Sequence, residues 1–265
     1  MEQHMNLDLH GKHAVVCGSS QGIGKAAAIS LAQCGANITL LSRNTDSLNL
    51  VKSELHQEGD QSHHVATADF TDPESVRNVA QKIASASPVH ILVNNTGGPP
   101  SGPLLDADVQ ALINGFSQHV VCNHHLMQAF VPSMKAANYG RIINIISTSV
   151  KQPIPNLGVS NTIRGAVASW AKTLATELGG FGITVNNVLP GFTDTVRLSS
   201  LFEANAKRQS TTPDVIKANA LATIPAKRLG LASELGDAVA FLASPAAGYI
   251  NGINLPVDGG RLGTL

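Results

Sequence analysis

The chain has 265 residues, 43% of them hydrophobic and 14% charged, and its formal net charge at neutral pH is zero. This balance supplies a large apolar core and excludes a disordered chain, which needs few apolar and many charged residues. Lysine and arginine never run for more than two residues together. The composition therefore also argues against a nucleic-acid-binding surface.

The sequence carries no signal for a membrane or for export. No apolar stretch reaches the length of about 18 residues that a membrane-spanning helix requires. Residues 1–13 lack the apolar segment of a signal peptide. The three cysteines, Cys17, Cys34 and Cys122, form no C-x-x-C pair, which is typical of a reducing compartment where buried thiols act as small hydrophobic groups. We expect a cytoplasmic protein without a reactive thiol.

Short apolar runs alternate with longer helical stretches along the chain. In chain order the pattern predicts a strand at 13–18, a helix at 22–35, a strand at 37–43, an amphipathic helix at 45–59 with Thr45 as its N-cap, a strand at 62–70, a helix at 72–87, a strand at 89–97, a long helical stretch at 105–138, a strand at 140–148, a helix at 157–179 and a strand at 183–191. A less regular region then runs to about 230, before a helix from Glu234 and the short segment 253–260.

Most of these strands are apolar throughout, so both of their faces are expected to be covered. Strands that alternate with helices of this length give a parallel sheet with helices on both sides. We therefore expect a Rossmann-type, doubly wound α/β fold in three layers. No linker, repeat or low-complexity tract divides the chain, so residues 1–265 are expected to form a single domain.

The first predicted strand runs directly into C-G-S-S-Q-G-I-G and then into a helix. Gly18, Gly22 and Gly24 have the spacing G-x-x-x-G-x-G, a variant of the dinucleotide-binding fingerprint. Glycines let the backbone turn sharply and approach a pyrophosphate that the amides of the following helix can bind. Glycines also make purely structural turns, but this placement favours a dinucleotide cofactor.

The residues after the second predicted strand indicate which dinucleotide is bound. An acidic residue there would bind the ribose 2′-hydroxyl of NAD and repel a 2′-phosphate. The sequence has Ser42-Arg43-Asn44 instead, and a guanidinium beside a hydroxyl suits a phosphate. The alternative is that Arg43 is only a solvated surface charge. We expect NADP(H) as the cofactor.

Five motifs in order resemble the short-chain dehydrogenase/reductase family over essentially the whole chain, especially its β-ketoacyl-carrier-protein reductase-like members. They are the glycine motif, Asp69 at the adenine, Asn94-Asn95-Thr96-Gly97, the segment from Pro190 to Thr195, and Val257 to Gly260. The resemblance implies a nicotinamide-dependent oxidoreductase. The cofactor-binding residues expected from the cradle and the resemblance are Gly18, Ser20, Gln21, Gly22, Ile23, Gly24, Ser42, Arg43, Asp69, Asn95, Gly97, Arg164, Pro190, Gly191, Thr193 and Thr195.

The catalytic positions depart from the family pattern. The family's serine falls on Ser147, but its tyrosine and lysine are replaced by Ser160 and Arg164, and its asparagine by His119. Tyr139 and Tyr249 are the only tyrosines, and neither stands where the acid belongs. The segment from Ser160 to Arg164 resembles an atypical subgroup with S-N-x-x-R in this place.

These replacements change the expected chemistry. Serine is a far weaker acid than a phenol, although Ser160 can still donate a hydrogen bond. Arg164 stays charged and can bind ribose hydroxyls or polarise a carbonyl. Since the two residues are four apart on one helix, they can reach one pocket. The imidazole of His119 ordinarily titrates near neutrality and could pass a proton through water, although a lone histidine is more often structural.

Other histidines are not expected to take part in chemistry. The pairs His63-His64 and His124-His125 are interpreted as satisfied surface or packing residues. No carboxylate–histidine spacing supports a metal site, so none is expected.

Three functions remain open at this point. The first, which we favour, is an NADPH-dependent reductase of a ketone or 3-oxoacyl thioester, with Ser147, Ser160 and Arg164 polarising the oxygen. The second is an enzyme that reduces an activated enone or performs non-redox chemistry. The third is an NADP(H)-binding sensor or assembly partner with weak or no activity.

The remaining expectations from the sequence concern substrate contacts and assembly. The proline-rich segment 97–103 is either a pocket wall or a plain connection. Region 195–229 corresponds to the family's mobile lid, and its basic residues could meet an acidic or carrier-bound substrate, although a solvated basic face is the default. Helices 105–138 and 157–179 form the dimer bundle in the family, which implies a homodimer or homotetramer; alternatively, they only cover the sheet.

Overall fold

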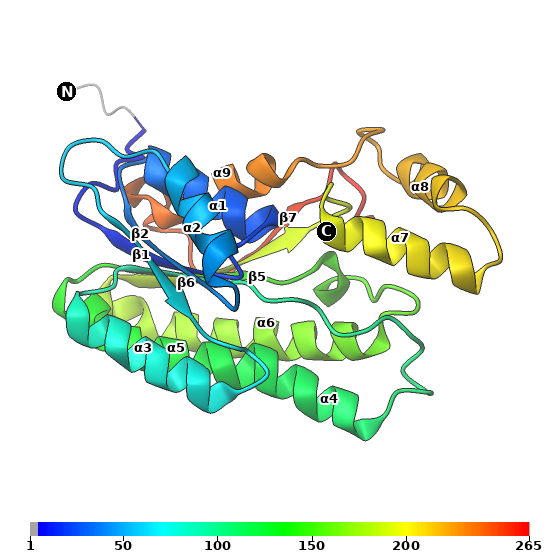
Figure 1. Cartoon of the computed structure of the whole chain (residues 1–265), viewed down its shortest axis with the longest axis horizontal. Helices are drawn as coiled ribbons and strands as arrows, with labels where there is room; N and C mark the ends of the chain where they lie inside the picture. Colours follow the sequence, from blue (N-terminus) through cyan, green and yellow to red (C-terminus); the bar gives the residue numbers. More distant parts are fainter. Residues whose placement is uncertain (1–4, 265) are drawn as a thin grey trace.

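The computed structural model describes residues 5–264, and within them one sheet of seven parallel strands is covered by helices on both faces (Figure 1). The strands are β1 (His13–Cys17), β2 (Asn37–Ser42), β3 (His63–Thr67), β4 (Ile91–Asn94), β5 (Gly140–Ile145), β6 (Ile183–Pro190) and β7 (Asn254–Val257). They lie in the order β3-β2-β1-β4-β5-β6-β7. This is the doubly wound Rossmann-type fold that the sequence predicts.

The helices divide between the two faces of the sheet (Figure 1). On one face lie α1 (Gly22–Gln33), α2 (Thr45–Glu54) and α9 (Ala232–Ala243). On the other lie α3 (Pro73–Ala86), α5 (Cys122–Ala136) and α6 (Gly158–Leu178). Each face encloses its own buried apolar cluster, which gives the three layers expected from the sequence.

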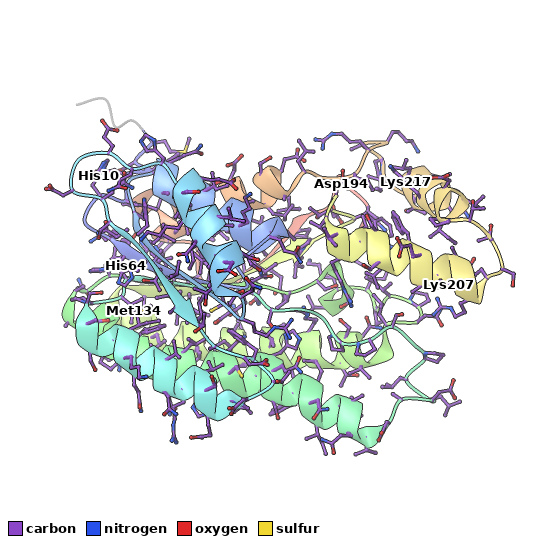
Figure 2. The ribbon with its side chains drawn as sticks, viewed as in Figure 1. His10, His64, Met134, Asp194, Lys207 and Lys217 are labelled. Carbon is purple, nitrogen blue, oxygen red and sulfur yellow. The ribbon has the colours of Figure 1, made fainter. Side chains whose placement is uncertain are left out.

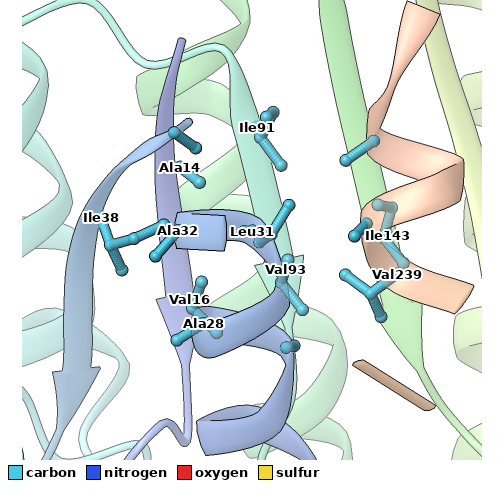
Figure 3. Close-up of a cluster of buried hydrophobic side chains, with 14 of the residues drawn as sticks. Ala14, Val16, Ala28, Leu31, Ala32, Ile38, Ile91, Val93, Ile143 and Val239 are labelled. Carbon is cyan, nitrogen blue, oxygen red and sulfur yellow. The ribbon is translucent and has the colours of Figure 1, made fainter. Parts of the chain in front are cut away.

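Small side chains bring α1 close to the sheet (Figure 3). Ala28 and Ala32 of α1 are fully buried in the same cluster as Val16 of β1 and Ile38 of β2. Because alanine adds only a methyl group, the helix backbone can lie near the strands without leaving a void. The start of α1 is thereby fixed at the carboxyl end of β1.

The chain reverses its winding between β1 and β4, which are neighbours in the sheet but far apart in sequence. Connections leave these two strands in opposite directions, so a crevice opens beyond their carboxyl ends. The residues after β1, β4, β5 and β6 therefore face one region of space.

Two predicted boundaries need correction. The N-cap of α2 is Asn44 and not Thr45, because the Asn44 side chain accepts a hydrogen bond from Ser47 N. The stretch 105–138 is helical only from residue 109, since the Asp108 side chain caps α4 (Val109–Phe116). A π-helical turn, Ser117–Val121, then joins α4 to α5.

The region up to residue 230 is more regular than predicted. It contains α7 (Val196–Arg208) and α8 (Pro213–Ala222), which pack together through their own apolar cluster built around Leu198, Phe202 and Ile216. Figure 1 shows both helices projecting from one end of the sheet. The sequence of α7 is amphipathic but contains few apolar residues overall, so its helical pattern was not recognised.

None of the helices within residues 5–264 has the combination of length and hydropathy that crossing a bilayer requires.

Candidate cofactor and active site

The glycine turn between β1 and α1 is packed too tightly to hold side chains. A Cβ on Gly24 would lie 2.2 Å from the carbonyl oxygen of Gly18, and one on Gly18 would lie 2.6 Å from that of Asn95. Gly18 also has φ +58°, in the left-handed region that glycine tolerates. The turn thus brings bare backbone against the end of β4.

Neighbouring residues hold this turn in place and leave its amides open. The Asn95 side chain donates to the carbonyls of Cys17 and Gly18, at 3.3 and 3.2 Å. The buried Ser19 hydroxyl, which the sequence analysis did not single out, accepts from Leu41 N at 3.0 Å. Gln21 is the N-cap of α1 but makes no capping bond, and the first turn has no acidic residue. Free amides at a helix N-terminus fit a pyrophosphate.

The ends of β2 and β3 carry the residues expected at the adenosine half of the cofactor. Asp69 accepts a hydrogen bond from Thr71 N at 2.9 Å, which lowers its pKa, and the charge of Arg43 lowers it further. Asp69 is therefore ionised at neutral pH. Arg43 itself is exposed beside Ser42, where a phosphate could reach it.

The segment from Pro190 to Thr195 lies across from the glycine turn. A Cβ on Gly22 would meet the Thr195 methyl at 3.5 Å. Gly191 N donates to Val257 O at 3.0 Å, and Thr193 forms a bridge with Gly230. The Thr195 side chain accepts from Leu198 N at 3.3 Å and caps α7. The fold therefore brings the two predicted cofactor segments together.

Ser147 and Ser160 are partly exposed at the carboxyl end of the sheet. The Ser147 hydroxyl accepts from Ser149 N at 3.1 Å, so its own proton remains available to a ligand. Ser160 has no hydrogen-bond partner among the described residues. Asn161 beside it donates to Ile154 O at 2.9 Å and accepts from Ile154 N at 3.3 Å, which ties the preceding loop to α6.

Arg164 is 8% exposed and points from α6 toward the sheet. Its Nη1 donates to Ile145 O at 2.9 Å, and its Nε has no partner. Burial and the nearby charge of Arg197 lower the pKa of Arg164 to about 10. The guanidinium is still charged at neutral pH, as the sequence analysis assumed.

His119 lies in the middle of the π-helical turn and is 1% exposed. Burial, with the charge of Arg164, lowers its pKa to about 2, despite a hydrogen bond with the backbone of Gly97. The expectation of a pKa near neutrality is therefore wrong, because the interior disfavours the imidazolium. The Nε2 atom has no partner. Rare π-helical turns are frequently found at functional sites.

Segment 97–103 is tied into the structure on both sides. Arg197 donates from Nη2 to Pro99 O at 2.9 Å, and Gly102 N donates to Asn156 O at 2.8 Å. These bonds join the segment to α7 and to the loop before α6. It thus borders the space beside Arg164.

The basic residues of region 195–229 lie mostly away from this space. Figure 2 shows Lys207 and Lys217 at the outer part of the α7–α8 pair, away from the sheet. Lys217 lines an open hollow with Asp194, Leu221, Lys227, Arg228, Leu229 and Leu231. Arg228 forms an ion pair with Glu234 at 2.6 Å.

A ladder of hydrogen-bonded asparagine side chains crosses the sheet beside the site. The sequence analysis did not identify it. The side chain of Asn94 donates to Asn144 at 2.8 Å, Asn144 to Asn187 at 2.9 Å, and Asn187 to Asn254 at 2.8 Å. These residues face one another in register on β4 to β7. The signal available in the sequence was that asparagine recurs near the ends of otherwise apolar strands.

Outside the site, two cysteines and two of the paired histidines are buried or hydrogen-bonded. Burial raises the pKa of the Cys122 thiol to about 12 and also raises that of Cys17, so neither is a reactive thiolate. His63 is buried and bonded to His56 O, and His124 accepts from the Trp170 indole. Within residues 5–264 no three His, Cys, Asp or Glu side chains gather as a metal-binding group.

Comparisons with known proteins agree with this fold. The family model described as Enoyl-(Acyl carrier protein) reductase matches residues 18–261. The NADPH-dependent reductase BacG of Bacillus subtilis is 32% identical over 251 residues, covering 94% of this chain and 97% of the relative. The 3-oxoacyl-[acyl-carrier-protein] reductase FabG of Haemophilus influenzae is 34% identical over 255 residues, covering 95% and 98%.

A solved structure extends the agreement to three dimensions. L-sorbose reductase from Gluconobacter frateurii, complexed with NADPH and L-sorbose, superposes with a TM-score of 0.91 at 31% identity, covering 98% of this chain and all of the other. The chain belongs to the short-chain dehydrogenase/reductase family.

Proposed function

We propose that this protein is an NADP(H)-dependent oxidoreductase that reduces a carbonyl group, of the ketone or 3-oxoacyl thioester type, in an active site without the usual tyrosine. The observation that carries the proposal is the convergence of a tight glycine turn with Ser147, Ser160 and a buried, charged Arg164 at the carboxyl end of one sheet. Relatives named as NADPH-dependent reductases support the cofactor class.

The chemistry of the residues at this site fits an NADP(H) cofactor. The turn at Gly18 and Gly24 has no room for a Cβ, and its uncapped helix start offers amides to a pyrophosphate. Arg43 and Ser42 would hold the 2′-phosphate, and Asp69 the adenine. Thr193, Thr195 and Asn95 would border the nicotinamide half. When bound, NADPH would supply the hydride for the reduction.

The serines and Arg164 would act on the carbonyl oxygen. Hydroxyl donors from Ser147 and Ser160 can bind that oxygen while the positive charge of Arg164 stabilises the negative charge that develops on it. As the hydride reaches carbon, the electron pair of the C=O double bond moves to oxygen. A proton from water then completes the alcohol.

His119, the residue expected to pass a proton to the substrate, does not carry an extra proton at neutral pH. His119 is neutral at physiological pH, since its pKa lies at about 2. Arg164, with a pKa of about 10, is charged at this pH, and we assign it an electrostatic role. Loss of a general acid typically costs about 10²–10⁴ in rate. We therefore propose a slow reductase that depends on electrostatic stabilisation.

A second candidate is reduction of an activated enone. Hydride addition to the far carbon of an enone places negative charge on an enolate oxygen, which needs a cation more than an immediate proton. The site has that cation, Arg164, and lacks the acid. A third candidate is a protein that binds the cofactor without turnover. The assay described next distinguishes it from the two reductases.

The test is NADPH oxidation with a panel of ketones, enones and β-ketoacyl thioesters. We expect turnover with at least one class, and a loss of about tenfold or more in Ser147→Ala and Arg164→Ala. Both variants should be checked for NADPH binding, so that lost affinity is not mistaken for lost chemistry. Tight NADPH binding without turnover of any compound would refute the reductase and leave the third candidate.

A further inference from the structure

Two arginine side chains from distant parts of the chain meet beside Gly98. Arg164 comes from α6, and Arg197 from the start of α7. A Cβ placed on Gly98 would lie 3.3 Å from Arg197 Nη2 and 3.8 Å from Arg164 Nη2. Both nitrogens therefore border the same small space, which the missing side chain of Gly98 leaves free. A single carboxylate could reach both of them.

Neither guanidinium has an acidic partner to offset its charge. The ion pairs recorded within residues 5–264 join other side chains. The charge of Arg197 lowers the pKa of Arg164, and no carboxylate raises the pKa of either. Two like charges side by side repel each other, and a buried charge is unfavourable unless it is compensated. The missing compensation points to a negatively charged ligand.

Arg164 also has donor capacity to spare. It is 8% exposed, its Nη1 is used by Ile145 O, and its buried Nε has no partner. Arg197 is exposed, and within residues 5–264 its one side-chain hydrogen bond goes from Nη2 to Pro99 O. Arg164 is thus fixed at the back of the space, while Arg197 stands at its open edge.

We infer that Arg164 and Arg197 together bind a carboxylate of the substrate, so that the carbonyl being reduced belongs to a short oxo acid. The inference rests on the proposed function, because it concerns the same active site. Guanidinium groups bind carboxylates through paired, charge-assisted hydrogen bonds. Two of them converging on one group would fix both its position and its orientation.

The spacing along α6 limits the length of this substrate. Arg164 stands one turn after Ser160, a rise of about 6 Å along the helix. A short substrate could therefore place its carbonyl oxygen at Ser160, still near the charge of Arg164, and its carboxylate between the two arginines. A 2-oxo or 3-oxo acid has this spacing, whereas a chain on a carrier has no free carboxylate there.

The cofactor is the other possible source of an anion. Its pyrophosphate already has the glycine turn and the open N-terminus of α1, which is built from a different part of the chain. The two arginines border Gly98, beyond β4, and not that turn. We therefore assign them to the substrate, and the experiment separates the two sources.

The experiment is isothermal titration of the enzyme saturated with NADP⁺. The probes are pyruvate, phenylpyruvate and acetoacetate, each compared with its methyl ester, which keeps the carbonyl and removes the charge. We expect at least one acid to bind at least about tenfold more tightly than its ester, a difference of about 1.4 kcal/mol.

Variants identify the residues responsible. Arg197→Met should abolish the preference for the acid, Arg197→Lys should retain part of it, and Gly98→Ala should weaken acid binding by filling the shared space. The matched control Arg208→Met removes an exposed charge at the far end of α7 and should leave the preference unchanged. NADPH affinity, measured by fluorescence, should stay within about threefold of the wild type in Arg197→Met.

The other outcomes contradict either the inference or the proposed function. Equal binding of acids and esters, or no binding of any acid, would refute the carboxylate site. A loss of about tenfold or more in NADPH affinity in Arg197→Met would assign the arginine to the cofactor's pyrophosphate. Acids that bind without being reduced would refute only the proposed reductase. Reduction of esters as fast as acids would refute only the inference.

Discussion

His119 combines two features that are uncommon in a folded chain, a π-helical turn and a fully buried imidazole. Its pKa of about 2 means that the folded chain cannot protonate it at mildly acidic pH, whereas the unfolded chain can. Below about pH 6.5 the unfolded state therefore binds more protons, and stability falls as pH falls, by at most about 1.4 kcal/mol per pH unit for one group. His13, whose pKa burial lowers to about 4, adds in the same direction.

We expect His119→Asn to reduce this acid sensitivity. Asparagine does not titrate, and the family resemblance has it in this position. Urea unfolding at about pH 5 and about pH 7.5 gives the difference in free energy of unfolding. The variant should show a smaller difference than the wild type. An unchanged difference in His119→Asn would mean that His119 is already protonated in the folded chain at about pH 5.

Variants at Ser160 and Arg164 test whether the pocket still supports proton donation by the family's tyrosine. Ser160→Tyr with Arg164→Lys rebuilds the family's acid, so ketone reduction should rise by about 10²-fold in kcat if the substrate site is otherwise intact. The single variant Ser160→Tyr is the control for the added ring alone. Unchanged turnover in the double variant, with normal NADPH binding, would show that the pocket has been remodelled for a substrate that needs no acid.

The positions of these residues could be predicted from the sequence, but their burial and protonation state could not. Ser147, Ser160, Arg164 and His119 could be located by motif spacing, because the fold keeps the end of β5 and the start of α6 in fixed register. Burial depends on packing from α4, α6 and the 97–103 segment together, so the pKa of His119 could not be predicted. Arg197 was overlooked for the same reason, since its meeting with Arg164 is made by the tertiary fold.

At the scale of elements, the segment that follows β4 makes a prediction about the cofactor. A Cβ on Gly97 would meet no protein atom within 4 Å, so Gly97→Ala should leave the unfolding midpoint nearly unchanged. If the cofactor occupies that space, the methyl group should weaken NADPH binding by about tenfold or more. Gly165→Ala, at an equally open position on α6, is the control and should bind NADPH normally. Normal binding by Gly97→Ala would place the cofactor elsewhere.

The asparagine ladder makes a prediction about the sheet. Asn144→Ala leaves the Asn94 amide and the Asn187 carbonyl without partners in a buried site, so it should reduce the free energy of unfolding by about 2 kcal/mol or more. Asn254→Ala removes the exposed end of the same ladder and should cost less than about 1 kcal/mol. Equal costs in urea unfolding would mean that the ladder does not stabilise the sheet.

Elements differed in how well their sequence predicted them. The strands followed from apolar runs, because parallel strands covered on both faces leave a continuous signal. Helices α7 and α8 were missed because they bury only a narrow stripe in a small cluster of their own. The exact start of α4 depended on Asp108, whose capping bond is visible only in three dimensions.

At the scale of the whole molecule, an unpartnered apolar stripe runs along α4. Val109, Ile113 and Phe116 of α4 are 67%, 52% and 46% exposed, and their spacing puts them on one helix face; Leu105, just before the helix, is 95% exposed. This agrees with the predicted role of these helices in a homodimer or homotetramer, because such stripes are usually covered. The assembly itself stays a prediction.

We expect light scattering after size exclusion to give the mass of a dimer or tetramer. Ile113→Asp should shift the protein toward the monomer, because a charge would be buried in the interface. Val215→Asp, on exposed α8, is the control and should keep the wild-type mass. A strictly monomeric wild type would contradict the prediction.

The central claim, that the site transfers hydride to a carbonyl carbon without a tyrosine, is tested most directly by isotope transfer. The enzyme would be incubated with NADPH deuterated at the reactive position of its nicotinamide and with the panel compound that gives the fastest turnover, and the product analysed by mass spectrometry and NMR. We predict an alcohol that carries deuterium on its carbinol carbon. Deuterium on the far carbon of a reduced enone, or none in any product while NADPH binds tightly, would contradict the claim.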